Sequence, residues 1–532
     1  MKIALANCLC FAAGTALLWL WMRIWYRRLV RTSREQVRHS DGRIVPGDPP
    51  CILFGNLPAV YRAANPLAAY NSLHARFGEI VQLYWMWRPQ VSISSYRMAL
   101  RVLHGNQNNY RKRPPNSVLE HLFGSSVLSE NGKEWKRWRM LISDIFSARR
   151  MTEFNDVFAE HAERLVSKWE HRILHAPDDV RFDILPDLTA VSLDVIGAAA
   201  LGRDFGALEG RADGFLKAFE YALEQSKRPV HAFTRWWKDL PVPSSRRLRE
   251  AFETIDEFLE RLIREGRERT RVGRSGARDL MDCLLGATSS SGDSAPLTDR
   301  EVRDNLLAIL ANGHQTVAIC LALTLYLLAR HPRVLAKARA EVDEFGSESV
   351  SQLRYLEAAL IESLRVYPAA AGLQRRSIQE DNLDGWSIPP GRAVGISLMP
   401  LHGSADWFGE SPEQFRPERY KPDSSGTGCP FHRAEQRTPL TGDKATGDVC
   451  LPLTFGAGAR RCLGEHFAMH EMKVMLATLI RRFDFGAVEG FRPDLDLDRF
   501  GLFIALRSTN GVHVAVARRT VRDLLPAAVQ GC

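Results

Sequence analysis

The segment Phe455–Gly464, FGAGARRCLG, places a single cysteine, Cys462, among glycines and arginines. Cys450 is the only other cysteine within thirty residues, and the sequence between the two is not typical of a metal-binding knuckle or a disulfide loop. A thiolate in this setting can act as a nucleophile, a redox centre or an axial ligand to iron. A buried cysteine taken alone is most often a small hydrophobic residue, so its flanking residues must indicate which chemistry applies.

The flanking residues favour a bulky, flat, anionic ligand. Gly456, Gly458 and Gly464 have no Cβ, so the backbone can come very close to such a group. Backbone N–H groups of the loop can donate hydrogen bonds to the sulfur and temper its donor strength. Arg460 adds a cation suited to a propionate, and a helical pattern opens at Gly464, where the helix dipole stabilises a thiolate.

At these positions the chain resembles the cytochrome P450 family. The matching residues of the family's haem-binding loop are Phe455, Gly458, Arg460, Cys462 and Gly464, and Ala468 and Glu471 continue the pattern. The resemblance implies haem b as cofactor, Cys462 as the protein ligand of its iron, and a mainly α fold with small β regions. It also disfavours a competing zinc site formed by His466, His470 and Glu471.

A second signature of the family is an acid and an arginine on one helix. Glu362 and Arg365 stand three residues apart in LIESLRVYP. A pair at this spacing is usually a surface ion pair of small energy. The resemblance instead implies that the pair contacts the arginine of a later motif, Arg419 in FRPERY, and supports the haem loop.

Further basic residues match the family's propionate ligands. Trp135 and Arg139, in EWKRWR, match a Trp-x-x-x-Arg helix that reaches one propionate. Arg376 stands five residues before Asp381 and resembles the second propionate arginine, although the adjacent Arg375 could take that role.

The segment LANGHQTVA, from Leu310 to Ala318, resembles the family's oxygen-activating helix. Gly313 matches the glycine that lets the helix approach iron, and Thr316 matches the threonine that helps deliver protons. A helical threonine otherwise tends to bond to a carbonyl one turn earlier. Gln315 occupies the position of the usual acid; it can orient water but cannot donate a proton as an acid does. Proton delivery is therefore expected through Thr316 and ordered water, with His314 as a further participant.

These motifs require a large helical domain to position them. A capping box at Thr298–Glu301 predicts a helix of about thirty residues that runs to His331-Pro332. Residues 116–285 have mostly helical periodicity. Two β-prone runs split by Arg88-Pro89 predict a hairpin within Gly78–Leu100, and a short β region is expected around Asp381–Gly391.

The N-terminus predicts a membrane anchor. Ile3–Met22 is uncharged over 20 residues, the length of a membrane-spanning helix, and arginines follow it. A cleaved signal peptide is the alternative, but no small-residue cleavage site follows the apolar run. We expect an anchor at 1–31, a proline-rich hinge at 32–58 and a monooxygenase domain at 59–532. Residues 422–449, polar and rich in glycine and threonine, are expected to form an exposed insertion.

Composition agrees with a globular, intracellular body. Hydrophobic residues make up 45% of 532 residues, and nine scattered cysteines argue against a disulfide framework. The net charge of +9 indicates a basic solvated surface, or an acidic partner or anionic membrane. No RNA-binding aromatic signature or basic low-complexity tail is present, so nucleic acid is not expected as a partner.

The favoured function is a haem-thiolate monooxygenase that inserts one oxygen atom from O2 into a lipophilic small molecule. No flavin or iron–sulfur module fits the remaining sequence, so electrons are expected from an NADPH-dependent cytochrome P450 reductase, with cytochrome b5 as a further candidate. The expected location is the endoplasmic reticulum membrane, crossed once, with the catalytic domain cytosolic. A basic cluster is expected to dock the reductase, unless it is merely solvated: Lys133, Lys136, Arg137, Arg460 and Arg461.

Two alternatives remain open from the sequence. A haem-thiolate isomerase or dehydratase would need no reductase, and Gln315 in place of an acid is compatible with it. A non-enzymatic haem-binding membrane protein would not need the helix that bears Thr316. Consumption of oxygen and NADPH separates the three functions.

Overall fold

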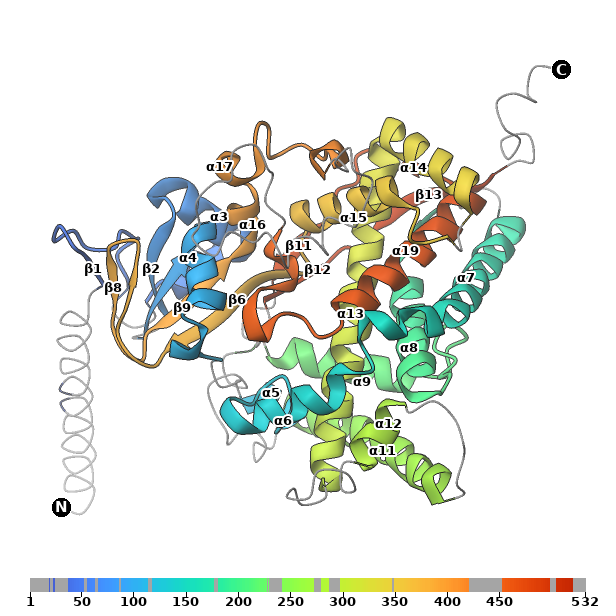
Figure 1. Cartoon of the computed structure of the whole chain (residues 1–532), viewed down its shortest axis with the longest axis horizontal. Helices are drawn as coiled ribbons and strands as arrows, with labels where there is room; N and C mark the ends of the chain where they lie inside the picture. The colour runs from blue at the N-terminus through green and yellow to red at the C-terminus, as the bar shows by residue number, and fades with distance from the viewer. Residues whose placement is uncertain are drawn as a thin grey trace, which may run out of the picture.

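The structure is a computed structural model of the 532-residue chain. It describes residues 37–519, together with Trp19 and Arg23, and its longest internal gaps are at 229–241, 272–278, 287–296 and 421–451. The expected membrane anchor, apart from Trp19 and Arg23, and the expected insertion at 422–449 therefore lie outside the described residues. Most strands lie on the left of Figure 1 and most of the long helices on the right, with α13 (Asp299–Arg330) between them, while β13 lies among the helices on the right.

Helices form most of the described chain. The N-terminal and central helices are α2 Leu57–Arg62, α3 Pro66–Phe77, α4 Tyr96–Leu100, α5 Ser117–Phe123, α6 Gly132–Ser143, α7 Asn155–His175, α8 Leu185–Leu201, α9 Asp213–Ser226, α11 Pro243–Arg271 and α12 Leu280–Leu285. The later helices are α14 Pro332–Phe345, α15 Arg354–Val366, α16 Leu398–His402, α17 Ala405–Phe408 and α19 Glu465–Arg482. Short irregular turns are η1 Arg101–Gly105, η2 Gln107–Asn109, η3 Ala148–Phe154, η5 Pro417–Tyr420, η6 Leu453–Phe455 and η7 Gly458–Arg460.

The strands of the described residues form three sheets. The largest has the order β11-β12-β6-β9-β3-β2, with β4 paired to β6 at its side; the others have the orders β1-β8-β7 and β10-β13-β5. The strand bounds are β1 Arg38–His39, β2 Ile80–Trp85, β3 Arg88–Ile93, β4 Tyr110–Arg111, β5 Arg181–Asp183, β6 Ala370–Ser377, β7 Asp381–Leu383, β8 Trp386–Ile388, β9 Ala393–Ser397, β10 Phe483–Ala487, β11 Leu495–Leu497, β12 Ile504–Ser508 and β13 His513–Arg518. The fold is thus helix-rich with small sheets, as the sequence predicts.

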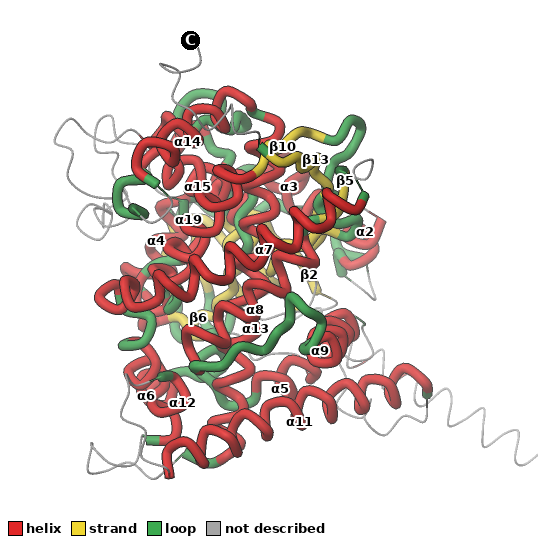
Figure 2. Tube along the Cα trace, turned by 90° about the vertical axis from the view of Figure 1, so that its right-hand side faces the viewer, coloured by secondary structure: helices red, strands yellow, loops and turns green. Residues whose placement is uncertain are grey.

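The long central helix begins where its capping box predicts. Thr298 Oγ1 accepts the Glu301 N–H, and the Glu301 carboxylate accepts the Thr298 N–H at 2.8 Å. The helix ends before His331-Pro332, because proline cannot continue the hydrogen-bond ladder. Among the described residues it is the one helix long and apolar enough to span a membrane, but 78% of its most apolar window is buried. It is therefore the core helix of the body, packed on α8, with α7 crossing in front of both (Figure 2).

The predicted hairpin is present as β2 and β3. The two strands pair antiparallel from Ile80↔Ile93 to Trp85↔Arg88. Arg88-Pro89 begins β3 rather than forming the turn, and proline is tolerated there because the pairing of β3 with β9 starts only at Gln90. The expected β region near Asp381 is the antiparallel pair β7–β8.

Part of the expected hinge belongs to the folded body. In β1, His39 pairs with Trp386, and both Val37 and Val45 are buried in a core cluster with the β3 and β9 strands. The Gln82 N–H donates to Pro46 O at 2.7 Å. The described part of 32–58 is therefore not a free linker, because burial of its apolar side chains attaches it to the sheet.

Candidate functional site

Cys462 stands in a tight loop directly before α19. Its N–H donates to Phe455 O at 2.8 Å and the Arg461 N–H donates to Gly458 O at 3.0 Å, so the loop is closed by its own backbone. Burial, with a smaller contribution from the Glu465 carboxylate, raises the pKa of the Cys462 thiol to about 11. The Gly464 N–H points at the sulfur and opposes this shift. The sulfur is enclosed by the protein but exposed to an internal cavity, where a metal ion could displace its proton.

Gly458 has a packing role in this loop. Its φ is +68°, and a Cβ there would lie 2.0 Å from Leu103 O and 2.5 Å from Gln107 Oε1. Gln107 Oε1 also accepts the Ala459 N–H at 2.6 Å. Only glycine fits this contact, which holds the loop against η1 and η2 rather than against a ligand. Gly464, by contrast, lines the cavity and has no atom within 4 Å of its Cβ position, so open space remains beside the sulfur.

Four cations line the same cavity near the sulfur. Arg139 donates to Arg461 O at 2.8 Å, and Arg460 donates to Glu130 O at 2.6 Å while its guanidinium lies 3.9 Å from the centre of the Trp135 ring. Burial and the charges of Arg375 and Arg139 lower the pKa of Arg460 to about 9. The fourth cation, Lys112, donates to Leu128 O at 2.9 Å. Its pKa is well below the ordinary value, chiefly because the amine is buried and secondly because Arg375 and Arg460 are positively charged.

The sequence motifs did not indicate Lys112, and they left Arg375 open as the alternative to Arg376; it is Arg375 that joins this cluster. Successive side chains of a strand point to opposite faces. On β6 it is Arg375 that is buried beside Lys112 and Arg460, whereas Arg376 donates to Gly391 O at 2.8 Å and faces Arg88 and Arg111. The spacing to Asp381 could not show which arginine faces the cluster. A shift of the β6 register by one residue would turn the other arginine to that face of the sheet.

The cation cluster fits a dianionic cofactor. Arg460 Nη1 is buried and has no hydrogen-bond partner within the described protein. Burying several like charges close to one another is unfavourable, and two carboxylates placed among them would relieve the repulsion. Haem b carries two propionates, so Lys112, Arg139, Arg375 and Arg460 would hold them while Cys462 binds the iron.

The acid and arginine of α15 form a buried network with Arg419. Arg365 donates from Nε and Nη2 to the two oxygens of Glu362, at 2.8 Å each, and Arg419 Nε donates to Glu362 Oε1 at 3.1 Å. All three charged side chains are at most 1% exposed. Arg419 also donates to Phe408 O and Glu410 O, both at 2.7 Å. The structure thus brings together the three residues that the sequence grouped. Their charged side chains are buried, unlike those of an ion pair on the solvated surface.

A histidine that the sequence did not indicate connects this network to the cysteine loop. Arg365 Nη1 donates to His402 O at 2.9 Å, and His402 Nε2 accepts the Leu453 N–H at 2.9 Å. Thr454 Oγ1 donates to Leu364 O at 2.9 Å. The loop that contains Cys462 is therefore tied at its start to α15, and His402 must be neutral with its proton on Nδ1 for these bonds to form.

Acid should unfold the protein through its buried histidines. Burial and the charge of Arg365 lower the pKa of His402 to about 3, and burial lowers that of His314 to about 4. Both lie below the unfolded value of about 6.5. Their contribution to stability is present above pH 6.5 and is lost as the pH falls, by about 1.4 kcal/mol per pH unit for each histidine. Guanidinium unfolding at pH 7 and pH 5 measures this loss. His402→Gln should reduce the dependence of the unfolding free energy on pH by about one proton. An unchanged dependence would contradict the assignment of a neutral, buried His402.

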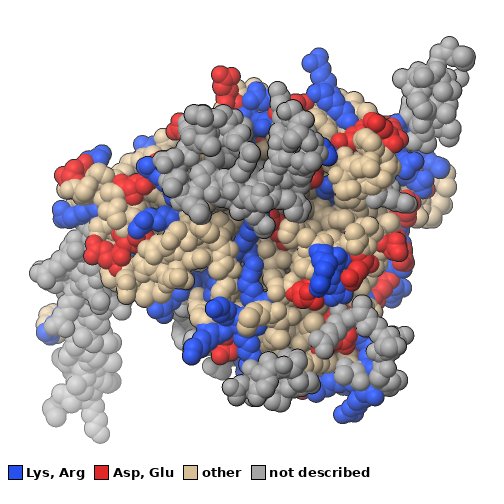
Figure 3. Space-filling view, viewed as in Figure 1, with Lys and Arg blue, Asp and Glu red and all other residues tan. Residues whose placement is uncertain are grey.

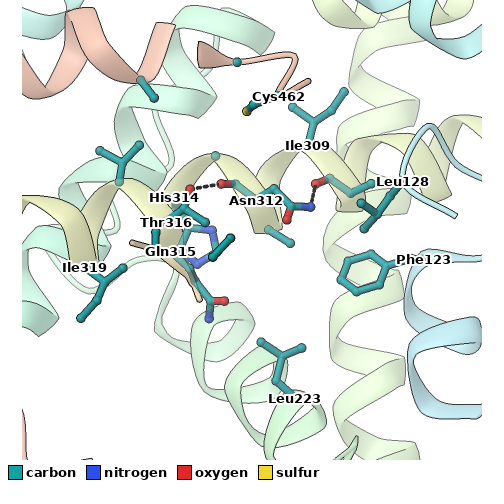
Figure 4. Close-up of a pocket in the computed structure, with 18 of the residues that line it drawn as sticks. Phe123, Leu128, Leu223, Ile309, Asn312, His314, Gln315, Thr316, Ile319 and Cys462 are labelled. Carbon is teal, nitrogen blue, oxygen red and sulfur yellow. Dashed lines mark hydrogen bonds between the residues drawn. The ribbon is translucent and has the colours of Figure 1, made fainter. Parts of the chain in front are cut away.

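The α13 face that the sequence indicated lies across the cavity from the cysteine loop (Figure 4). The Thr316 hydroxyl donates to Asn312 O at 2.5 Å, the local bond typical of a helical threonine, and its lone pairs remain available to accept a proton donor. Asn312, which the motif did not single out, donates from its carboxamide to Ala308 O at 2.5 Å and lines the cavity. Asn312 and Thr316 thus place two polar side chains, one helical turn apart, on the part of α13 that lines the cavity.

The other residues of the α13 motif have different surroundings. A Cβ on Gly313 would lie 2.9 Å from Ile196 of α8, so close helix packing, and not only approach to a ligand, requires glycine there. Gln315 extends from α13 toward Leu223, away from Cys462 in the view of Figure 4. His314 is fully buried, with Nδ1 2.6 Å from Leu310 O, and is neutral at pH 7 because of its lowered pKa.

The zinc alternative is not supported within the part of the chain that the structure describes. No group of three or more metal-ligating side chains occurs there. His470 Nε2 instead lies 2.5 Å from Asn155 Oδ1, and burial raises the pKa of Glu471 well above its ordinary value, which disfavours a charged ligand there.

The cavity shared by the sulfur and α13 is large and mostly apolar. Its volume is about 2000 Å³. The apolar side chains come from segments far apart in the sequence: Leu119, Phe123, Leu128, Leu223, Ile309, Ile319, Ala369, Leu373 and Leu506. A cavity of this size can hold a large prosthetic group beside a lipophilic molecule.

Comparison with known proteins identifies a family for this chain. The family model described as Cytochrome P450 matches residues 45–510. Similar proteins include "Cytochrome P450 97B2, chloroplastic" of Glycine max, 29% identical over 81% of either chain, and "Cytochrome P450 4d2" of Drosophila melanogaster, 26% identical over 95% of this chain and 97% of the relative. "11-oxo-beta-amyrin 30-oxidase" of Glycyrrhiza uralensis is 28% identical over 78% of this chain and 77% of its own length. The chain belongs to the cytochrome P450 family, whose members bind haem iron through a cysteine thiolate and are generally monooxygenases.

Proposed function

We propose that this protein inserts one atom of O2 into a lipophilic small molecule, by hydroxylation or epoxidation, with electrons from a separate NADPH-dependent flavoprotein. One observation carries the proposal: the Cys462 sulfur and the Thr316-bearing face of α13 line the same large apolar cavity. A reactive centre at the sulfur end would therefore meet an apolar substrate and a source of ordered protons in one enclosed space.

The protein's residues would bind and orient the cofactor. Cys462 would hold the iron of haem b, and Lys112, Arg139, Arg375 and Arg460 would hold its propionates. When bound, the haem supplies oxygen binding and O–O cleavage, which an electron-rich thiolate ligand favours. The Glu362–Arg365–Arg419 network and His402 would fix the loop, and the Gly464 N–H would temper the sulfur's donor strength.

Proton delivery would depend on the polar side chains of α13. The Thr316 hydroxyl can rotate from Asn312 O to hydrogen-bond an ordered water, and the Asn312 carboxamide can fix that water. Gln315 can orient a second water but holds no acidic proton. His314 Nε2 has no hydrogen-bond partner among the described residues, so this neutral ring could accept a proton from the same chain of waters.

Thr316→Ala is expected to keep haem and substrate binding but to uncouple the reaction. NADPH oxidation should continue while product falls by about one to two orders of magnitude, because an oriented proton donor contributes roughly 10²-fold or more. The missing electrons should be recovered as hydrogen peroxide.

Gln315→Glu should give equal or better coupling at neutral pH, since a carboxyl replaces the amide. Product, NADPH and peroxide measured in one reaction check both, and wild-type coupling in Thr316→Ala would show another proton route.

The proposed reductase would dock beside α6. Lys133 and Lys136 are exposed on this helix next to the half-buried Arg137, and Figure 3 shows basic side chains gathered at the lower centre of the visible face, where α6 lies. Two members of the predicted cluster have other contacts: Arg460 turns inward to Trp135, and Arg461 donates from Nε and Nη2 to the Glu465 carboxylate at 2.5 and 2.6 Å. An acidic flavoprotein, or cytochrome b5, is complementary to the remaining patch.

We further propose a single-pass anchor at 1–31, with the body on the cytosolic face of the endoplasmic reticulum. The uncharged run at Ile3–Met22 and the arginines after it support this orientation. Carbonate-washed membrane fractions test it: full-length protein should remain with the membrane, and protein lacking residues 1–31 should be released with its haem. Recovery with plastids, the location named for the Glycine max relative, would contradict the proposed organelle.

An isomerase or dehydratase that needs no reductase is the second candidate, favoured by Gln315 in the position of the acid. The experiment that separates the functions supplies haem-loaded full-length protein with a reductase and a panel of lipophilic compounds. A monooxygenase consumes O2 and NADPH as product forms. An isomerase forms product without consuming either, and a binding protein forms none.

A further inference from the structure

An exposed pair of histidines stands at the end of α7. His171 and His175 are four residues apart, and His175 is the last residue of the helix. Their rings are stacked, with centroids 4.0 Å apart and ring planes at 26° to each other. Residues four apart on a helix share a face, so both side chains extend from the same side of α7. The helix lies at the surface of the molecule, in front of α8 in Figure 2.

The ring of His175 is already oriented as a metal ligand. Its Nδ1 lies 2.8 Å from His171 O, and because a carbonyl oxygen only accepts, Nδ1 must carry the proton and donate it. In the neutral ring the lone pair is therefore on Nε2. Metal-binding histidines commonly have this arrangement, in which one ring nitrogen donates to a backbone carbonyl and the other binds the ion.

The ring of His171 is available as the second ligand. Within the described chain this side chain forms neither a hydrogen bond nor an ion pair, and its ring contact is with His175. Both side chains are exposed, so rotation about their Cβ–Cγ bonds can turn the two Nε2 atoms toward one ion without moving the backbone. Two histidines four apart on one helix face are a known arrangement for binding a divalent metal.

The charges around the pair permit a bound cation. The helix ends at His175, and the C-terminal end of a helix dipole favours positive charge. The nearest basic side chains along α7 have other partners. Lys168 forms an ion pair with Asp187 at 2.8 Å, and the guanidinium of Arg172 lies 4.0 Å from the centre of the Phe182 ring.

A second pair with the same spacing shows that spacing alone does not make such a site. His466 and His470 of α19 are also four residues apart, but both are half-buried and His470 Nε2 lies 2.5 Å from Asn155 Oδ1. The α7 pair differs in its exposure and in the absence of a partner for either Nε2 among the described residues. No third metal-ligating side chain joins it there, so water would complete the coordination of an ion.

We propose that His171 and His175 form a two-histidine site for a divalent transition-metal ion at the end of α7. Imidazole nitrogen suits Zn²⁺, Ni²⁺ and Cu²⁺, and the general order of affinities places Cu²⁺ first. The ion would link residues one helical turn apart and oppose fraying of the helix end, where the Ala176 N–H donates to Arg172 O at 3.0 Å. Neither histidine lines the cavity of Cys462, so the site is independent of the proposed monooxygenase function.

Calorimetric titration of haem-loaded, full-length protein with Ni²⁺ tests the site. The protein carries no affinity tag, and Ni²⁺ is used rather than Cu²⁺ because Cu²⁺ also oxidises thiols and the chain has nine cysteines. His171→Gln and His175→Gln should each weaken the binding by about a hundredfold, because the second nitrogen binds an ion that the first already holds. Hydrogen exchange of the Ala176 amide should slow when Ni²⁺ is added to the wild type, and should not change in either variant.

Two further variants separate chelation from other effects. His104→Gln removes an exposed histidine of η1 and should keep the wild-type affinity. Leu174→His in the His175→Gln background replaces a side chain that is 76% exposed and gives a pair three residues apart on the same face, so it should recover most of the lost affinity.

Four results would each overturn the proposal. The first is a single variant that binds Ni²⁺ as tightly as the wild type, and the second is a loss in His104→Gln as large as that in His171→Gln. The third is a single variant that binds less Ni²⁺ at unchanged affinity, which would mean that the two rings bind separate ions. The fourth is an Ala176 amide that exchanges at the same rate with and without Ni²⁺.

Discussion

Replacing Cys462 with serine or histidine is expected to abolish the thiolate-type spectrum of the ferrous–CO form and reduce product formation to background. Cys462 is the proposed thiolate donor, and it lines the cavity from a loop closed by its hydrogen bond to Phe455 O. A serine hydroxyl does not ionise near neutral pH, and histidine is a neutral donor, so neither can supply the charge of a thiolate. The CO-difference spectrum of the purified variants measures the result.

Cys320 provides a matched control for this experiment. It also lines the cavity, from α13, and it is buried, with a pKa raised by burial to about 12. Cys320→Ala should therefore retain the thiolate-type spectrum, because this neutral thiol is not the proposed ligand. An intact spectrum in Cys462→Ser would contradict the haem-thiolate assignment.

Glu362→Gln is expected to cost about 3–5 kcal/mol of folding stability, because it leaves two buried guanidinium groups without their shared counter-charge. Arg365 and Arg419 are each 1% exposed, so water cannot replace the carboxylate. Most domains are stable by only about 5–15 kcal/mol, so the variant should lose haem on purification or unfold at a much lower denaturant concentration. Urea unfolding followed by circular dichroism, together with the haem-to-protein ratio, measures both effects.

The control for this variant keeps the same spacing on an exposed helix. Glu134 and Arg137 of α6 are also three residues apart, with a 4.0 Å contact, and the Glu134 side chain is 58% exposed. Glu134→Gln should change stability by less than about 0.5 kcal/mol, as for most exposed pairs. Equal losses in the two variants would show that the Glu362 network supports nothing beyond an ordinary helix pair.

Local rules allowed the sequence alone to predict several parts of this molecule. The capping box at Thr298 and the proline after His331 delimit α13, because caps and prolines act through neighbouring backbone groups. The β2–β3 hairpin follows from two β-prone runs close together in the sequence. The loop around Cys462 could be recognised because its residues are contiguous, and the family of the chain follows from them.

The tertiary structure alone decided which distant side chains meet. Lys112 enters the cation cluster because β4 pairs with β6, and the same pairing turns Arg375 toward Cys462 and Arg376 away from it. His402 reaches the start of the cysteine loop across 51 residues of sequence. Glycine is required at position 313 because Ile196 of α8 packs against it, and not only because a ligand lies near. Strand register and helix packing come from the burial of whole faces, so no short stretch of sequence contains them.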